Sequence, residues 1–137
     1  MAVTVRDIMT TGLTTVAPDM SAVDAAKAMK DEDAGVAPVT EGQRLVGMLT
    51  DRDLVVRVLA EERDPAAVSV REVMSGELVT ISADADAREA AALMRDHRVR
   101  RIPVADGARL VGIVAQADIA RTLPNELVGD VVSGISQ

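Results

Sequence analysis

The sequence predicts an α+β protein made of two tandem β-α-β-β-α repeats related by a pseudo-two-fold axis. When the chain is shifted by 65 positions, Val5–Val55 falls on Val70–Ala120 without a gap. Each copy carries two short apolar runs separated by a glycine-containing turn, which is typical of a β-hairpin. Before and after this hairpin, apolar residues recur at helical spacing. A unit of this size buries little apolar surface alone, so we expect the copies to pair, with a ligand cleft at their junction.

The first repeat begins with a short run of β-forming residues at positions 13–17. Ser21 then follows, with Asp24 three residues later, which is the pattern of a helix N-cap. Val23, Ala26 and Met29 supply an apolar stripe at helical spacing, so they are the predicted buried face of this first helix.

Two buried strands are predicted next, at 36–39 and 45–49, joined by a turn at 40–43 that contains Gly42. A second helix is expected from Thr50 to about Leu59. The second repeat copies this order, with a helix opening near Asp86 and strands at 102–105 and 110–114.

The predicted domain organisation is therefore repeat 1 at 1–60, a linker at 61–69, repeat 2 at 70–122 and a C-terminal helix or tail at 123–137. Charged residues and Pro65 mark the linker. The tail has an apolar stripe, which fits either packing on the same chain or a contact between subunits. This stripe consists of Val128, Val131, Val132 and Ile135.

Composition excludes several classes of function. The chain has 137 residues and a formal net charge of −7, which opposes broad nucleic-acid binding because such binding needs a basic surface. Phe, Tyr and Trp are absent, so no aromatic side chain can stack on a base. No membrane span or signal peptide is evident, and there is no cysteine. We expect a cytoplasmic protein that contacts neither nucleic acid nor membrane.

No catalytic motif accompanies the repeats. Patterns for nucleotide hydrolases, serine hydrolases, zinc proteases and dinucleotide-binding enzymes are missing. His97 is the single histidine and cannot form a zinc set without cysteine partners. The prediction is a protein that is not an enzyme and has no catalytic residues, no metal site and no required cofactor.

The segment from Thr50 to Asp53 suits a nucleotide, because it follows a strand and opens a helix. Backbone N–H groups at a helix start favour phosphate, the Thr50 hydroxyl can donate to a phosphate oxygen, and Asp53 can accept from a ribose diol. The same two residues also form a capping box, which many helices use without any ligand. Both interpretations fit the residues.

Four motifs, matched in order in both copies, resemble the CBS-domain family. Gly47-Met48-Leu49-Thr50-Asp51-Arg52-Asp53 is similar to the segment that ends a CBS domain, and residues 112–118 are its imperfect copy. Arg100-Arg101-Ile102-Pro103-Val104 resembles the basic strand of the family. Val-x-x-h-Met opens both repeats. The resemblance covers about residues 3 to 122, as in a stand-alone CBS pair, or Bateman module.

This resemblance implies a regulatory ligand-binding module. Family members hold adenosine-type ligands between the repeats, so AMP or ATP is the expected ligand, with NADH or S-adenosylmethionine as alternatives. The family also forms dimers and reports ligand state to a partner. A homodimer and an unidentified regulated protein are therefore expected. A CBS-pair interaction module without a nucleotide ligand is the alternative.

In the family each site combines Thr-x-x-Asp from one repeat with basic residues from the other. Thr50 and Asp53 would thus face Arg100 and Arg101. Because neighbouring strand residues point to opposite faces, one arginine would face the core unless a bulge or a ligand intervenes. The resemblance implies that the apolar lining of this site is Met48, Leu78, Val79, Val99 and Pro103.

The second site is predicted to be weaker. Ala115 replaces the threonine, and Gly35 and Val36 replace the two arginines, so the site lacks both hydroxyl and cations. Its implied residues are Asp118, Ile113, Leu13, Thr14 and Pro38.

Overall fold

The computed structural model describes residues 3–122, which form a mixed fold of helices and strands, as predicted. The stripe predicted at 125–136 lies outside the described residues. The helical elements are α1 (Val5–Ile8), α2 (Ala22–Asp31), α3 (Asp51–Leu54), η1 (Val55–Leu59), α4 (Val70–Val73), α5 (Ala87–His97) and α6 (Gln116–Ala120). The strands are β1 (Val36–Glu41), β2 (Arg44–Thr50), β3 (Arg101–Asp106) and β4 (Arg109–Ala115).

Each repeat contributes one antiparallel hairpin, which confirms the predicted strand pairs. β1 pairs with β2 so that Val36 lies opposite Thr50, and β3 pairs with β4 so that Arg101 lies opposite Ala115. The turns use Gly42 and Gly107, whose φ angles are +63° and +62°. Glycine adopts this left-handed backbone without steric cost, which explains its place in both turns.

The run at 13–17 forms no regular strand. Only Val16 pairs, through a single parallel bridge to Val39, and Ile81 pairs with Val104 in the same way in the second copy. Pro18 follows two residues later and has no N–H to continue a ladder. The predicted first β-element of each repeat is therefore reduced to one bridge.

The first long helix of each repeat is capped as expected. The Ser21 hydroxyl accepts from the Asp24 N–H at 3.1 Å, and the Asp86 carboxylate accepts from the Arg88 N–H at 2.8 Å. The predicted buried stripe on α2 was partly wrong, because the helix turns Ala22, Ala25 and Met29 into the core, while Val23 and Ala26 are only half-buried.

The helix predicted after Thr50 is present but changes character along its length. It is α-helical over α3 and π-helical over η1, where the Ala60 N–H donates to the Val55 carbonyl, five residues back, at 2.8 Å. π-Helical turns are rare and occur frequently at functional positions.

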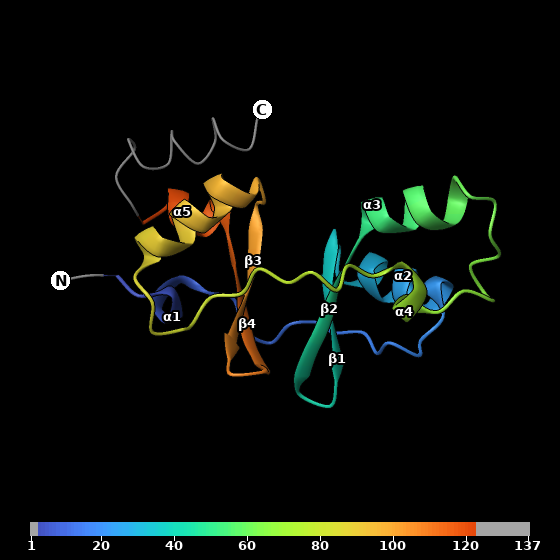
Figure 1. Cartoon of the computed structure of the whole chain (residues 1–137), viewed down its shortest axis with the longest axis horizontal. Helices are drawn as coiled ribbons and strands as arrows, with labels where there is room; N and C mark the ends of the chain where they lie inside the picture. Colours follow the sequence, from blue (N-terminus) through green and yellow to red (C-terminus); the bar gives the residue numbers. More distant parts are fainter. Residues whose placement is uncertain (1–2, 123–137) are drawn as a thin grey trace. The chain divides into compact units, whose positions relative to one another are not determined.

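The chain folds into two compact units that do not coincide with the two sequence repeats. The repeat-1 unit is made of residues 13–78, and the repeat-2 unit is made of 3–12 together with 79–122. The short helix that opens each repeat thus belongs to the unit of the other repeat. Figure 1 shows α1 beside α5 and β4, and α4 beside α2.

We call α1 and α4 the exchanged helices. Equivalent backbone hydrogen bonds hold both of them. In the repeat-2 unit the Val5 N–H donates to Ala85 at 2.9 Å, and in the repeat-1 unit the Val70 N–H donates to Met20 at 2.8 Å. Their valines are fully buried: Val5 joins a core with Met94 and Ile102, and Val70 joins a core with Met29 and Leu49.

Gly47 and Gly112, which begin the two Gly-h-h segments, pack closely against the residues that end the exchanged helices. A Cβ at Gly47 would lie 2.5 Å from the Met74 sulfur and 3.0 Å from the Ser75 carbonyl oxygen. A Cβ at Gly112 would lie 2.8 Å from the Met9 sulfur and 2.9 Å from the Thr10 carbonyl oxygen. The Val-x-x-h-Met and Gly-h-h motifs are therefore two halves of one packing contact.

Candidate functional site

Thr50 and Asp53 form a reciprocal capping box at the start of α3. The Thr50 hydroxyl oxygen accepts from the Asp53 N–H at 3.0 Å, and Asp53 Oδ2 accepts from the Thr50 N–H at 2.9 Å. The capping interpretation is confirmed. The role of these residues in ligand binding stays a prediction, and the cap is compatible with it because it uses only part of each side chain.

The cap leaves two polar groups without a hydrogen-bond partner among the described residues. Among residues 3–122, no recorded hydrogen bond uses the hydrogen of the Thr50 hydroxyl. The second Asp53 oxygen, Oδ1, is 3.9 Å from Arg57 Nε, which is beyond hydrogen-bonding distance. The Asp53 side chain is 15% exposed. A donor on Thr50 and an acceptor on Asp53 therefore remain without hydrogen bonds at the start of α3.

Asp118, the equivalent carboxylate of repeat 2, has both oxygens engaged. Oδ2 accepts from the Ala115 N–H at 2.8 Å, and Oδ1 accepts from the Arg121 guanidinium at 2.5 Å. Its side chain is 8% exposed. Ala115 has no hydroxyl, so this position offers a ligand neither the free donor nor the free carboxylate oxygen that repeat 1 keeps.

Arg100 and Arg101 are both exposed, and no ion pair within the described part of the chain involves either of them. A simple strand would point one of them toward the core, but the structure exposes both. β3 begins at Arg101, and Arg100 lies in a bend before it, so the strict alternation of a strand does not apply to the pair.

The same bend places these arginines beside their own helix start. The Gln116 N–H donates to the Arg100 carbonyl at 2.8 Å, and in the repeat-1 unit the Asp51 N–H donates to the Gly35 carbonyl at 3.0 Å. Each unit therefore sets the start of its first hairpin strand next to its Thr-x-x-Asp position. In the repeat-2 unit that neighbour is cationic, and in the repeat-1 unit it is neutral.

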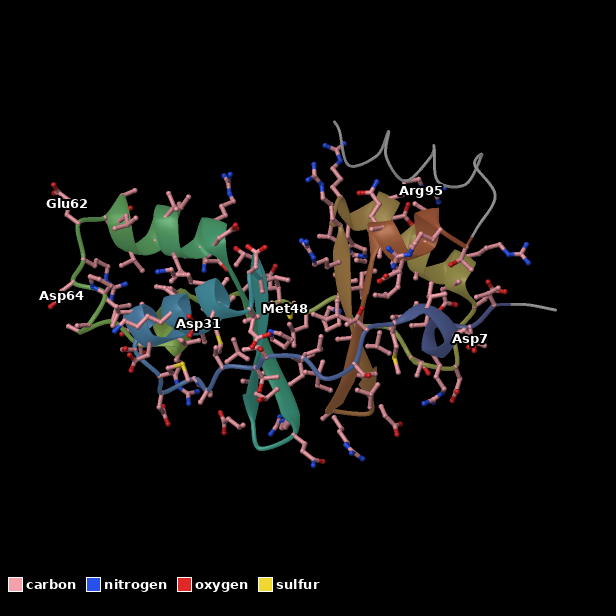
Figure 2. All side chains as sticks on the ribbon, turned by 180° about the vertical axis from the view of Figure 1, so that it is seen from behind. Asp7, Asp31, Met48, Glu62, Asp64 and Arg95 are labelled. Atoms are coloured by element: carbon pink, nitrogen blue, oxygen red, sulfur yellow. The ribbon has the colours of Figure 1, made fainter. Side chains whose placement is uncertain are left out.

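The residues predicted for the stronger site come from both units. Met48, on β2 in Figure 2, is half-buried, as are Leu78, Val79 and Val99, whereas Pro103 is buried. The repeat-1 unit contributes Met48, Thr50, Asp53 and Leu78, and the repeat-2 unit contributes Val79, Val99, Arg100, Arg101 and Pro103. Their meeting in one site stays a prediction.

The weaker site is likewise predicted to draw on both units. Asp118 and Ile113 are buried in the repeat-2 unit, and Leu13, Thr14 and Pro38 belong to the repeat-1 unit. The assembly of this second set also stays a prediction.

Two arginines that the sequence did not single out form ion pairs with the two carboxylates, at 3.9 Å in repeat 1 and 2.5 Å in repeat 2. Arg57 is four residues after Asp53, and Arg121 is three residues after Asp118. Both spacings bring side chains together on one helical face, so this spacing could have indicated them.

The capping carboxylates of α1 and α4 have pKa values lowered by the hydrogen bonds that they accept. The Thr4 backbone N–H, 3.0 Å away, lowers the pKa of Asp7, which lies on α1 in Figure 2. The Ser69 backbone N–H, followed by Arg63, lowers the pKa of Glu72. Both shifts stabilise the charged form of a capping carboxylate, so they concern the fold of the two short helices.

Residues 3–122 contain no group of three or more acidic or histidine side chains arranged to hold a metal ion. The same residues include no helix of the length and apolar character that crossing a bilayer needs.

A family model described as the CBS domain matches residues 5–60 and 70–125. The chain belongs to the CBS-domain family. It is 43% identical over 133 residues to CBS domain-containing protein YhcV of Bacillus subtilis, covering 96% of this chain and 94% of that protein. It is 41% identical over 133 residues to Hypoxic response protein 1 of Mycobacterium tuberculosis, covering 96% and 93%.

Two solved structures extend these similarities. Hypoxic Response Protein I, described with two coordinated zinc ions, superposes with a TM-score of 0.80 at 42% identity, over 88% of this chain and 99% of that one. The CBS domain pair of protein MJ0100, described in complex with 5-methylthioadenosine and S-adenosyl-L-methionine, gives a TM-score of 0.78 at 27% identity, over 88% and 95%. These relatives are named for their CBS domains or for a hypoxic response, not for a catalysed reaction.

Proposed function

We propose that this CBS pair is a regulatory module that binds one adenine nucleotide of the AMP or ATP type per chain. The observation that carries the proposal is the difference between the two capping carboxylates. Asp53 keeps Oδ1 unbonded beside the Thr50 hydroxyl, whereas both oxygens of Asp118 are engaged. One repeat is thus equipped to accept ribose hydroxyls, and the other is not.

The phosphate would be bound by Arg100 and Arg101. Both are exposed, and neither has a recorded acidic partner within residues 3–122. Guanidinium groups bind phosphate oxygens in bidentate fashion, and the free Thr50 hydroxyl adds a further donor. The apolar lining offers no aromatic surface, so the adenine would lie between aliphatic side chains such as Met48 and Pro103.

The MJ0100 pair supports the ligand class, because it is described with two adenosine-containing ligands. NADH and S-adenosylmethionine share the adenosine group and are the alternatives to AMP and ATP. Binding would favour one arrangement of the module, and a regulated protein would sense that arrangement, provided that the ligand binds the two arrangements unequally.

Isothermal titration calorimetry with AMP, ATP, NADH and S-adenosylmethionine tests the proposal. We expect about one ligand per chain. Asp53→Asn should abolish most of the heat while leaving an amide oxygen to accept from the Thr50 N–H. Asp118→Asn is the matched control and should bind as the wild type does. Two equivalent sites, or equal losses in both variants, would contradict the proposed asymmetry.

The alternative function is a protein-interaction module without a nucleotide. It is favoured by three large apolar side chains exposed on the helix that follows the Thr-x-x-Asp segment: Val55, Val56 and Leu59, exposed by 54%, 44% and 66%. Exposed apolar side chains that cluster on one face are typical of contact surfaces, including those of homodimers. No heat with any of the four ligands would favour this alternative.

A further inference from the structure

Arg57 connects the candidate ligand carboxylate to the end of an exchanged helix. It lies in the π-helical segment η1, with half of its side chain exposed. Its Nη1 donates to the carbonyl oxygens of Val73 at 3.1 Å and Met74 at 3.3 Å, and its Nε is 3.9 Å from Asp53 Oδ1. One guanidinium is therefore shared between an acidic oxygen and two backbone carbonyls.

The two carbonyls lie at the C-terminus of α4, where backbone acceptors have no partner within the helix. The next residue, Ser75, exchanges two backbone hydrogen bonds with Met48, at 2.9 and 3.0 Å. Met48 and Leu78 belong to the predicted lining of the stronger site. Arg57 thus bonds the two residues directly before Ser75, which pairs with the strand that ends in Thr50.

The repeat-2 unit lacks this connection. Its exchanged segment makes the same backbone pair, between Thr10 and Ile113, but the residue equivalent to Arg57 is Thr122. The Thr122 hydroxyl donates to the Asp118 backbone carbonyl at 2.9 Å. Within 3–12 and 79–122, no recorded side-chain hydrogen bond reaches the carbonyls of Ile8 or Met9. The arginine connection is specific to the repeat that keeps a free carboxylate oxygen.

We propose that Arg57 is a positioning residue that transmits occupancy of Asp53 to the segment 74–78. A ligand hydroxyl that donates to Asp53 Oδ1 offsets part of the negative charge that attracts Arg57. The guanidinium then interacts more strongly with the Val73 and Met74 carbonyls, and this strengthens the backbone hydrogen bonds between Ser75 and Met48. The transmission step rests on the proposed nucleotide site, whereas the holding of the segment does not.

Hydrogen exchange of the Met48 and Ser75 amides measures this effect directly. In the ligand-free protein, Arg57→Thr installs the residue found in repeat 2 and should speed exchange of both amides about tenfold, as expected for loss of charge-assisted hydrogen bonds. Arg57→Lys keeps one charged donor and should restore part of the protection. The matched control is Arg63→Thr, which removes a different contact to α4, the 2.8 Å bond to Glu72, and should leave both amides unchanged.

Addition of AMP separates the transmission step from simple holding. AMP should slow exchange of these amides in the wild type and in Arg63→Thr. In Arg57→Thr, calorimetry should still detect AMP binding, but AMP should no longer slow hydrogen exchange of the Met48 and Ser75 amides. Equal slowing in Arg57→Thr and the wild type would overturn the transmission role.

The two proposals fail in distinguishable ways. If the wild type binds none of the four ligands tested by calorimetry, the nucleotide assignment and the transmission step are both wrong. The ligand-free comparison still decides whether Arg57 holds the segment. Equal exchange in Arg57→Thr and Arg63→Thr would overturn that as well.

Discussion

Asp53 and Asp118 hold equivalent positions in the two repeats and cap their helices in the same way, yet their second oxygens differ. In repeat 1, Oδ1 has only Arg57 nearby, at 3.9 Å, because that arginine donates to the end of α4. In repeat 2, Oδ1 is bonded by Arg121. The difference shows that one backbone arrangement can present two chemically different sites when the side chains one helical turn later differ between the repeats.

The residue that precedes the first hairpin strand also differs between the two units. At Gly35 a Cβ would lie 3.3 Å from Asp51 Oδ2, so this position in the repeat-1 unit favours the smallest residue. The equivalent position in the repeat-2 unit is Arg100, which lies beside Gln116, a neutral residue. Cations are therefore present in the unit that lacks the free hydroxyl and carboxylate oxygen.

The largest expected effects come from the exchanged helices. Val5→Ala and Val70→Ala each remove buried methyl groups and leave a cavity, so each should destabilise its unit by about 2–3 kcal/mol. Hydrogen exchange should show faster opening of 79–122 in Val5→Ala and of 13–60 in Val70→Ala. If each substitution instead sped hydrogen exchange in the unit of its own repeat, the packing of α1 and α4 in the unit of the other repeat would be contradicted.

The glycine contacts should be nearly as sensitive. Gly47→Ala and Gly112→Ala place a Cβ within 3.0 Å of a backbone carbonyl, so each should lower the free energy of unfolding by about 1–3 kcal/mol. Urea unfolding measures both. Gly76→Ala, with no atom within 4 Å of the added Cβ, is the control and should be neutral.

The caps allow a reciprocal test. Thr50→Ala should destabilise the ligand-free protein by about 1 kcal/mol, because the Asp53 N–H loses its acceptor. Ala115→Thr should stabilise the repeat-2 unit by a similar amount, since Ala115 already has extended backbone like that of Thr50. Thermal unfolding measures both changes, and Thr50→Ser should restore the wild-type value. No gain in Ala115→Thr would show that the two caps are not equivalent.

The smallest expected effect is on the loss of stability at acidic pH. The folded-state pKa values of Asp7 and Glu72 are lowered by their caps, so their contribution to stability is complete above the unfolded-state pKa. That contribution is lost as the pH falls through the folded-state pKa. Asp7→Asn and Glu72→Gln should each reduce the loss of stability on acidification, measured by thermal unfolding across pH. A slope equal to that of the wild type would contradict the prediction.

The sequence predicted the long helix and the hairpin of each repeat because their signals are local. A cap such as Ser21 with Asp24, or a glycine turn such as that at Gly42, depends on residues only a few positions apart. It also predicted Thr50 and Asp53 as a capping pair, since three-residue spacing brings their backbone and side chains together. Two positions of the α2 stripe, Val23 and Ala26, were assigned one residue too late, because alanines at 22 and 25 do not distinguish a buried face from a neutral one, whereas Met29 was assigned correctly.

The sequence by itself determined the repeat, the long helix and the hairpin of each copy and the candidate carboxylates, since each follows from short-range periodicity or from comparison of the two copies. It did not predict the short helices α1 and α4. Only the tertiary structure decided that α1 and α4 pack in the unit of the other repeat, because those contacts join residues far apart in the chain. It also decided which carboxylate oxygen stays free. Arg57 and Arg121 both lie one turn after an aspartate, and only the nearby α4 carbonyls draw Arg57 away.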